Sequence, residues 1–396
     1  MGFFNKVLGT GVSQSPAQGK LSGLLKERGY VYQHSAPLEE ITDGQKRTLY
    51  LGIDPSADSL HVGSLVGLLV MRQFLEHGHK VILLTGGGTG MIGDPGGKSE
   101  ERNLLDEAAV AKNSRAVAAQ IRKVFGRSDF IEENNVKWLT SIKLLEFLRD
   151  IGKHFTVNSM IKKDTVKTRL DAEAPLSFTE FSYSLLQGYD FLHLNQEYVC
   201  DLQVGGSDQW SNILSGVEFI RRKTGKTVYA FTWPLLINKS TGKKFGKSEA
   251  GAVWLDPAKT SPFQFYQFWF NAADADVEDY LLKMTLMSKR DIDEVMKEQN
   301  ANPAARAAQK RLAYEVTALV HGEDEAKRAR DFENIPAINT GKLRDVMKDF
   351  STSELRRLVE QGGVSSATSG KIDSIDYEIK TGEEIKIGKS KVYKAK

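Results

Sequence analysis

Two short segments hold residues suited to binding phosphate groups. His61-Val62-Gly63-Ser64 stands seven residues after Asp54, where a helix is expected to begin. The unpaired N–H groups of a helix start attract anions, an imidazole can donate to a phosphate oxygen, and Gly63 would let a nucleotide approach the backbone. Lys243–Ser248 (KKFGKS) places lysines in a glycine-containing stretch that would suit a clamp on developing phosphate charge. Taken singly, an exposed helix-start histidine and a solvated lysine turn explain these two segments better.

The residues around the histidine segment predict a parallel sheet. Thr48–Asp54 (TLYLGID) and Lys80–Thr85 (KVILLT) are short apolar runs, and Leu60–His77 between them repeats apolar residues at helical spacing. Strand, helix and strand in this order form a βαβ unit with parallel strands. The pattern therefore favours an α/β fold in which the histidine segment follows the first strand.

The rest of the chain continues this pattern and then changes character. The sequence predicts a helix, a strand, a turn that opens a further helix, and another strand over Phe178–Phe191, Tyr198–Val204, residues 205–220 and Ala230–Ile237. Residues 257–320 are mostly helical in pattern. Residues 341–396 combine one short helix, Ser353–Gln361, with glycine-punctuated strand-like pieces. At 396 residues, the length predicts two or three domains.

Composition narrows the class of protein. Hydrophobic residues make up 40% and charged residues 27%, and the net charge is only +3, so any RNA-binding surface must be local. Cys200 is the only cysteine, which excludes an intramolecular disulfide and fits a reducing compartment. No apolar run approaches the roughly 20 residues that cross a bilayer, and no secretory signal is evident. We expect a cytoplasmic protein without membrane contact.

Two glycine-rich matches are rejected. Gly88, Gly90 and Gly93 have the spacing of a dinucleotide fingerprint, but Asp94-Pro95-Gly96-Gly97 follows where that motif must open a helix. Asp94 would also repel a pyrophosphate. Residues 93–99 (GDPGGKS) resemble a P-loop that is one residue too short.

The two phosphate segments gain meaning from their order. A His-x-Gly after the first strand and a Lys-x-Gly-Lys-Ser before a helical region resemble the two signature sequences of class I aminoacyl-tRNA synthetases. The stretches between them resemble the tyrosyl-tRNA synthetase family of bacterial type, over residues 50–64 (YLGIDPSADSLHVGS), 86–102 (GGGTGMIGDPGGKSEER), 178–191 (FTEFSYSLLQGYDF) and 205–212 (GGSDQWSN). Ser64 departs from the family, which often has a second histidine there.

The resemblance implies a two-step reaction in which ATP is a substrate. The carboxylate of L-tyrosine attacks the α-phosphate of ATP and releases pyrophosphate, and the 3′ end of tRNA(Tyr) then accepts tyrosine. Mg²⁺ would arrive with ATP, without a protein-bound metal. The implied catalytic residues are His61, Ser64, Lys244 and Lys247. The implied ATP-binding residues are Ser56, Gly63, Gly206, Asp208, Lys244, Phe245, Gly246, Lys247 and Ser248.

The resemblance also implies a tyrosine site. Asp94, Tyr183 and Gln187 match positions that bind the α-ammonium group, and Gln209 matches a position near the carboxylate. Tyr50 and Asp190 match the pair that bonds the phenol hydroxyl. Such a pair rejects phenylalanine because its own polar atoms would stay unpaired, and tyrosyl enzymes are the standard example of this rule. Asp54 is a weaker candidate, because the turn at the end of a strand is a strong alternative explanation for an aspartate there.

Partners and domains follow from the same resemblance. We expect a Rossmann-like catalytic domain over residues 1–235, a helical domain with the lysine loop over 236–335, and a small α+β S4-like RNA-binding domain over 340–396. Residues 341–396 hold 12 Lys and Arg against 9 Asp and Glu, and Arg356 and Arg357 on the short helix are the expected RNA contacts. A homodimer is expected, with its interface on an insertion at about residues 130–175.

Three other readings stay open at this point. A tryptophanyl synthetase would share the fold but not Tyr50 with Asp190. A small-molecule adenylyltransferase would need neither the lysine segment nor a basic tail. A non-catalytic RNA-binding relative should have lost His61 or the substrate carboxylates, which this chain keeps.

Overall fold

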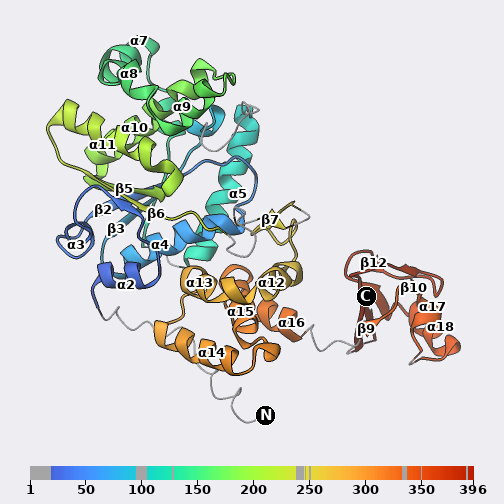
Figure 1. Cartoon of the computed structure of the whole chain (residues 1–396). Helices are drawn as coiled ribbons and strands as arrows, with labels where there is room; N and C mark the ends of the chain where they lie inside the picture. The colour runs from blue at the N-terminus through green and yellow to red at the C-terminus, as the bar shows by residue number, and fades with distance from the viewer. Residues whose placement is uncertain are drawn as a thin grey trace. The chain divides into compact units, whose positions relative to one another are not determined.

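The computed structural model describes residues 19–94, 105–126, 129–237, 245, 247–248, 251–331, 337–348, 350–388 and 391–396 (Figure 1). The chain divides into two compact units, Met1–Ala326 and Lys327–Lys396. The first unit holds a parallel sheet and a group of helices, and the second holds a small sheet. The boundaries predicted near residues 235 and 335 remain predictions.

A six-stranded sheet forms the centre of the first unit. Its strand order is β1-β6-β5-β2-β3-β4, and only β1 runs antiparallel to its neighbour. The strands are β1 (Gln33–His34), β2 (Thr48–Ile53), β3 (Lys80–Thr85), β4 (Ile131–Asn134), β5 (Cys200–Gly206) and β6 (Tyr229–Trp233). The predicted βαβ unit is confirmed, because β2 and β3 pair in parallel and α4 (Leu65–Glu76) connects them after the short turn η1 (Val62–Ser64).

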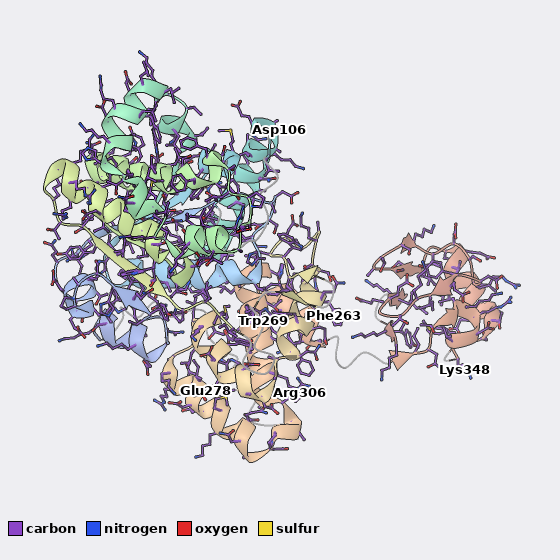
Figure 2. All side chains as sticks on the ribbon, turned by 45° about the horizontal axis from the view of Figure 1, so that its top comes forward. Asp106, Phe263, Trp269, Glu278, Arg306 and Lys348 are labelled. Carbon is purple, nitrogen blue, oxygen red and sulfur yellow. The ribbon has the colours of Figure 1, made fainter. Side chains whose placement is uncertain are left out.

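Helices cover both faces of this sheet, which explains why its central strands β2 and β3 are largely apolar. Tyr50, Ile82 and Leu84 pack in one cluster with residues of α10 (Phe178–Tyr198) and α11 (Trp210–Thr224). Alternate residues face the other side. A Cβ added to Gly67 of α4 would lie 3.1 Å from Leu51. Helix α5 (Glu107–Phe125), which begins at its cap Asp106 (Figure 2), lies beside β3.

Several boundaries differ from the sequence prediction. Helix α10 continues through Tyr198, beyond the predicted end at Phe191, and stops where Val199 takes a left-handed conformation with φ 54°. β5 therefore begins at Cys200 rather than Tyr198. The strand predicted over Ala230–Ile237 ends at Trp233 as β6, because Pro234 has no N–H to donate to the ladder.

Short helices fill the stretch between β4 and α10. They are α6 (Val136–Leu139), α7 (Leu144–Glu146), a π-helical turn η3 (Phe147–Ile151), η4 (Gly152–His154), α8 (Val157–Met160) and α9 (Asp164–Asp171). Several of their large apolar side chains are exposed, including Leu144 at 70% and Leu145 at 78%. These residues fall within the predicted insertion at about 130–175.

The helical part of the first unit follows the sheet. It comprises α12 (Pro262–Phe270), α13 (Asp274–Met284), α14 (Lys289–Ala301), η6 (Pro303–Ala305), α15 (Ala307–His321) and α16 (Glu323–Asp331), the last of which runs into the second unit. Trp269 and Arg306 lie in this part (Figure 2). The N-terminal helix α2 (Leu21–Glu27) is tied to it, since Arg28 donates to the carbonyls of Leu282, Thr285 and Met287 at the end of α13. Helix α3 (Leu38–Thr42) leads from β1 towards β2.

The second unit has its own core. Its five-stranded sheet has the order β12-β11-β14-β15-β9, and β10 pairs with β13. The elements are β9 (Ala337–Ile338), β10 (Gly341–Lys342), α17 (Leu343–Val346), α18 (Thr352–Glu360), β11 (Val364–Ser366), β12 (Gly370–Lys371), β13 (Glu378–Ile379), β14 (Glu384–Ile387) and β15 (Lys391–Ala395). Leu355 and Val359 of α18 pack against Val364, Ile385 and Ile387. A short helix on a small sheet agrees with the α+β prediction for this region.

Candidate active site

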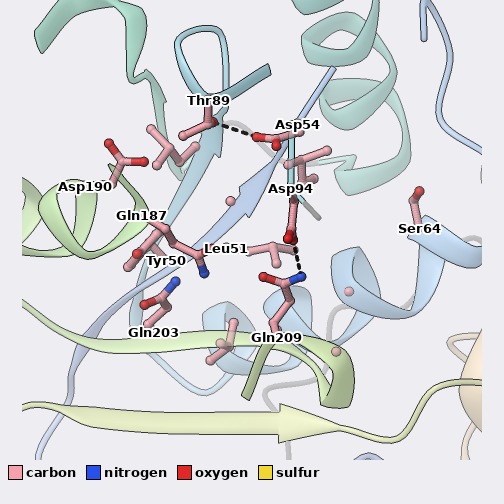
Figure 3. Close-up of a pocket in the computed structure, with 18 of the residues that line it drawn as sticks. Tyr50, Leu51, Asp54, Ser64, Thr89, Asp94, Gln187, Asp190, Gln203 and Gln209 are labelled. Carbon is pink, nitrogen blue, oxygen red and sulfur yellow. Dashed lines mark hydrogen bonds between the residues drawn. The ribbon is translucent and has the colours of Figure 1, made fainter. Parts of the chain in front are cut away.

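A pocket opens at the carboxyl ends of β2 and β5, the usual ligand position in a parallel sheet (Figure 3). Most of the predicted site residues line it together. They are Tyr50, Asp54, Ser56, Gly63, Ser64, Asp94, Tyr183, Gln187, Asp190, Gly206 and Gln209. The structure thus gathers residues that are up to 159 positions apart in the chain, from Tyr50 to Gln209.

Asp190 forms the floor of the pocket. It is 3% exposed, and both of its oxygens accept hydrogen bonds from buried donors. The indole Nε1 of Trp138 donates to Oδ1 at 2.7 Å, and Nδ2 of Asn135 donates to Oδ2 at 2.9 Å. Burial raises the pKa of Asp190 to about 7, although these two hydrogen bonds oppose the shift and the nearby charge of Asp54 adds to it.

Tyr50 lies at the same depth. Its side chain is 1% exposed, and its hydroxyl makes no hydrogen bond with any residue that the structure describes. Burial raises the pKa of Tyr50 well above its ordinary value, and the charge of Asp190 acts in the same direction. A neutral phenol donor next to a carboxylate acceptor is the arrangement that a substrate hydroxyl would complete.

Asp54 organises the wall beside this floor. Its Oδ2 accepts from the Tyr183 hydroxyl at 2.7 Å, and its Oδ1 accepts from Thr89 Oγ1 at 2.7 Å. A Cβ on Gly86 would lie 1.9 Å from Oδ1, so only glycine fits there. Asn135 also donates to Thr89, at 2.9 Å, which joins the Asp54 and Asp190 networks.

Asp94 and Gln209 stand nearer the mouth of the pocket. Nε2 of Gln209 donates to Oδ2 of Asp94 at 2.7 Å (Figure 3). Tyr183, Gln187 and Asp190 share one face of α10, as their spacing predicts. The pocket therefore carries carboxylates at two levels, which would suit a ligand with a cationic group at one end and a hydroxyl at the other.

His61 is exposed at the rim and is not among the described residues that line the pocket, although Gly63 and Ser64 are. Its Nδ1 accepts from the Gly63 N–H at 3.0 Å. This contact places the proton of a neutral ring on Nε2, where it can serve as a donor. Asp208 is also outside the lining, but its Oδ1 would lie 2.7 Å from a Cβ on Gly206.

The histidine segment is paired with the chain that follows the lysine segment. The N–H of Val62 donates to the carbonyl of Val253 at 2.9 Å, and the N–H of Leu255 donates to the carbonyl of Leu60 at 2.8 Å. The His61 ring meets the Trp254 ring edge-on at 6.4 Å. The chain that begins five residues after the lysine segment therefore lies beside the histidine segment.

The lysine segment itself is only partly described. Lys244 and Gly246 lie outside the described residues. Lys247 and Ser248 form β7 (Lys247–Ser248), which pairs with β8 (Gly251–Ala252). Phe245 packs at 4.9 Å from Tyr280 and 5.4 Å from Trp269, between ring centroids, and its N–H donates to Leu236. Phe245 is thus a packing anchor of this segment.

Two other predicted features lie elsewhere. Arg356 and Arg357 are exposed on α18 of the second unit. Cys200 is fully buried, and burial raises the pKa of its thiol well above the ordinary value, in accord with a packing role. Within the described ranges, no group of three or more His, Cys, Asp and Glu side chains is placed to hold a metal ion, and no helix is long and apolar enough to cross a membrane.

Comparison with known proteins decides the family. The model of the tRNA synthetases class I (W and Y) matches residues 42–334. A tyrosine–tRNA ligase of Roseiflexus castenholzii is 46% identical over 352 residues, covering 86% of this chain and 83% of that protein. One of Staphylococcus saprophyticus is 47% identical over 365 residues, covering 87% and 86%. The chain belongs to the tyrosine–tRNA ligase family. The prediction of a class I synthetase of tyrosyl type is confirmed at this level.

Solved structures agree with this assignment. A C-terminally truncated mitochondrial tyrosyl-tRNA synthetase of Aspergillus nidulans superposes with a TM-score of 0.72 at 30% identity, over 80% of this chain and 94% of that one. The class I fold predicted for this tyrosine–tRNA ligase family member is therefore confirmed. Members of this family are aminoacyl-tRNA ligases that use ATP, so the prediction of an ATP-dependent ligase is confirmed.

Three residues of this tyrosine–tRNA ligase site were not predicted from the sequence. They are Asn135 and Trp138, which donate to the buried Asp190, and Thr89, which donates to the partly buried Asp54. Asn135 directly follows β4, and side chains at the carboxyl ends of parallel strands often reach a ligand. Asn135 could therefore have been predicted from its position after a strand. Nothing in the sequence distinguishes Trp138 from the other apolar residues of its short helix, so it could not have been predicted.

Proposed function

We propose that this chain activates L-tyrosine with ATP to form tyrosyl-adenylate and pyrophosphate, and then transfers tyrosine to the 3′ end of tRNA(Tyr). The observation that carries the proposal is the buried pair of Tyr50 and Asp190 on the pocket floor. The Tyr50 hydroxyl can donate to the phenol oxygen of the substrate, and Asp190 can accept a hydrogen bond from the phenol O–H of the substrate. A ligand without that hydroxyl would leave the buried Tyr50 hydroxyl unpaired and would give Asp190 no donor besides Trp138 and Asn135.

The rest of the pocket suits the other end of tyrosine. Asp94, Tyr183 and Gln187 line the cavity, and their oxygens would accept from an α-ammonium group. Gln209, held to Asp94 at 2.7 Å, is placed to bond the carboxylate. Tyrosine would thus lie with its phenol on the floor and its carboxylate towards the rim, where Ser56, Gly63 and Ser64 lie.

Activation needs no nucleophile from the protein, because the tyrosine carboxylate is already ionised. Its oxygen forms a bond to the α-phosphorus of ATP while the bond to pyrophosphate breaks. The protein would contribute orientation and charge stabilisation. We assign this role to His61, Ser64, Lys244 and Lys247, with Gly206 and Asp208 at the ATP ribose. Phe245, Gly246 and Ser248 complete the ATP site in this proposal. Mg²⁺ would enter bound to the ATP phosphates and offset their charge.

Amino-acid-dependent exchange of labelled pyrophosphate into ATP tests this function. Tyrosine, phenylalanine and tryptophan are compared in parallel with folded protein and Mg²⁺. We expect exchange with tyrosine alone. Exchange with tryptophan would favour the tryptophanyl reading, and no exchange with any of the three would reject the proposed reaction.

A homodimer is the second part of the proposal. Several large apolar side chains within residues 144–178 are exposed, among them Leu145, Val157 and Phe178 at 78%, 62% and 76%. This concentration of exposed apolar residues in one segment favours an interface there. In sedimentation velocity, Leu145→Asp should shift the protein towards monomer. Val199→Asp is the matched control, because Val199 is 73% exposed but lies outside this segment.

The remaining parts concern RNA and location. We infer that the S4-like unit over residues 340–396 contacts tRNA phosphates through Arg356 and Arg357, which are exposed on α18. The catalytic and helical domains would divide near residue 235. A cytoplasmic location fits the buried free cysteine and the role in translation.

A further inference from the structure

Residues 253–260, which we call the strap, run alongside the loop that carries His61. The two backbone hydrogen bonds that flank His61 join this loop to the strap. Between these bonds, His61 and Trp254 stand opposite each other as an antiparallel pair. A pair of this kind, which exchanges no hydrogen bonds itself, has its side chains closer together than the other pairs of an antiparallel ladder. Trp254 is therefore the cross-strand neighbour of the His61 ring.

Two described contacts orient the His61 ring. Its Nδ1 accepts from the N–H of Gly63 at 3.0 Å, and a Cβ on Gly63 would lie 2.8 Å from its Cε1, so the ring lies against the Gly63 backbone. Its centroid lies 6.4 Å from that of the Trp254 ring, and the two ring planes are 71° apart. Edge-on contacts at this separation are favourable between aromatic rings. The hydrogen bond sets which nitrogen carries the proton, and the Trp254 ring limits rotation of the imidazole.

Trp254 is itself held by the strap. Nζ of Lys259 lies 5.1 Å from the centroid of the Trp254 ring, within the range of a cation–π contact, and Lys259 also pairs with Asp58. The backbone N–H of Trp254 donates to Oγ1 of Thr260 at 3.0 Å. Trp254 is partly buried, whereas His61 is exposed. A ring that is anchored in this way is placed to steady the exposed ring opposite it.

We propose that Trp254 is a positioning residue for the activation step, which holds the His61 ring in the orientation in which its Nε2–H can donate to a phosphate group of ATP. Trp254 touches no substrate in this proposal and acts through His61. The inference rests on the proposed function, since it takes adenylate formation as the reaction. Its effect belongs to the rate of the chemical step, because a fixed donor stabilises charge that develops in the transition state.

The test is a double-mutant cycle on adenylate formation, measured on the full chain with tyrosine, ATP and Mg²⁺. Trp254→Ala should lower kcat roughly 10-fold with an unchanged KM for tyrosine, and Trp254→Phe, which keeps an aromatic ring, should recover most of that loss. In a chain that already carries His61→Ala, the same Trp254→Ala change should lower kcat less than about twofold, because the group that it positions is gone. Trp254→Leu keeps apolar bulk without an aromatic ring, and it replaces Trp254→Ala in the cycle if that variant does not fold.

Tyr229→Ala is the matched control. Tyr229 of β6 is also a partly buried ring with a cation over it, since the Arg47 guanidinium lies 4.0 Å from its centroid, but it does not belong to the described pocket lining. Its substitution should leave kcat unchanged. An equal loss from Trp254→Ala with and without the His61 imidazole would overturn the proposal in favour of general packing, and so would a normal kcat in Trp254→Ala. Failure of the wild-type chain to show tyrosine-dependent exchange would reject the proposed function itself, which is a separate result.

Discussion

At the floor of the pocket, Asp190 is buried and each of its oxygens is held by a buried donor, whereas at the rim His61 is exposed and its described hydrogen bond joins it to its own turn. The floor is made of side chains from β2, α6 and α10 and the residue after β4, locked together before a ligand arrives. The described part of the rim is made of a helix start and glycines, namely Gly63, Ser64 and Gly206. We infer that the floor sets which amino acid binds, and that the rim sets how fast it reacts.

The largest effect should come from breaking the floor. In Asp190→Asn, the amide NH₂ group would face either the Trp138 or the Asn135 donor, and the charge that accepts the substrate hydroxyl would be lost. We expect tyrosine to bind at least ~100-fold more weakly, while ATP affinity changes little. Equilibrium dialysis with each substrate measures both.

Asp201→Asn is the control for loss of a carboxylate near this sheet. Asp201 on β5 pairs with Arg47 at 2.6 Å and does not belong to the described pocket lining. Its substitution should lower stability without changing tyrosine affinity. Unchanged tyrosine affinity in Asp190→Asn would show that the pocket floor does not determine which amino acid binds.

Breaking the rim should give a different signature. His61→Ala removes the imidazole donor at the phosphate end, so we expect kcat for adenylate formation to fall roughly 100-fold with an unchanged KM for tyrosine. Ser64→Ala should cost less, about 10-fold, because a serine donor carries no charge. Pre-steady-state kinetics of adenylate formation separate the two parameters. A raised KM for tyrosine with normal kcat in His61→Ala would contradict the division between floor and rim.

The two regions also differ in how far the sequence predicted them. The rim could be predicted, because His61, Gly63 and Ser64 lie within four consecutive residues at the first helix start after the strand β2. Tyr183, Gln187 and Asp190 were legible as one helical face. The hydrogen bonds that hold Asp190 could not be predicted in this way. Asp190 is 52 residues from Trp138 and 55 from Asn135, and no local pattern links them. Pairing of Leu60–Val62 with Val253–Leu255 is a contact of the same long-range kind.

A milder substitution tests the hydrogen bond from Trp138 to Asp190 alone. The Trp138 ring stacks on the His193 ring, with 4.1 Å between their centroids. Trp138→Phe keeps an aromatic ring at this position but removes the indole N–H that donates to Asp190. We expect tyrosine affinity to fall about 10-fold and the pKa of Asp190 to rise further. Trp269→Phe is the matched control, because Trp269 is buried in the helical part and its Nε1 has no partner among the described residues. Equal loss in both variants would mean that packing, and not the hydrogen bond, matters.

The smallest effect should be a pH dependence confined to the floor. With the pKa of Asp190 at about 7 in the empty site, most molecules carry a protonated Asp190 at pH 6 and an ionised one at pH 8. The protonated form is a weaker acceptor and carries no charge, so tyrosine should bind mainly to the ionised form. Tyrosine affinity should therefore rise about 10-fold from pH 6 to pH 8, because binding follows the ionised fraction. Isothermal titration of tyrosine across this range measures it.

The same shift acts on folding with the opposite sign. A carboxyl whose folded pKa is raised stabilises the fold below its ordinary pKa, and that stability is lost as the pH rises through about 7. The empty wild-type protein should lose up to about 4 kcal/mol from this group between pH 4 and pH 8, and Asp190→Asn should lack this part. His193 stacks on Trp138 and also titrates, so His193→Gln is the control. The same two variants test the pH dependence of tyrosine affinity. If that dependence persists in Asp190→Asn, or disappears in His193→Gln, then a group other than Asp190 causes it.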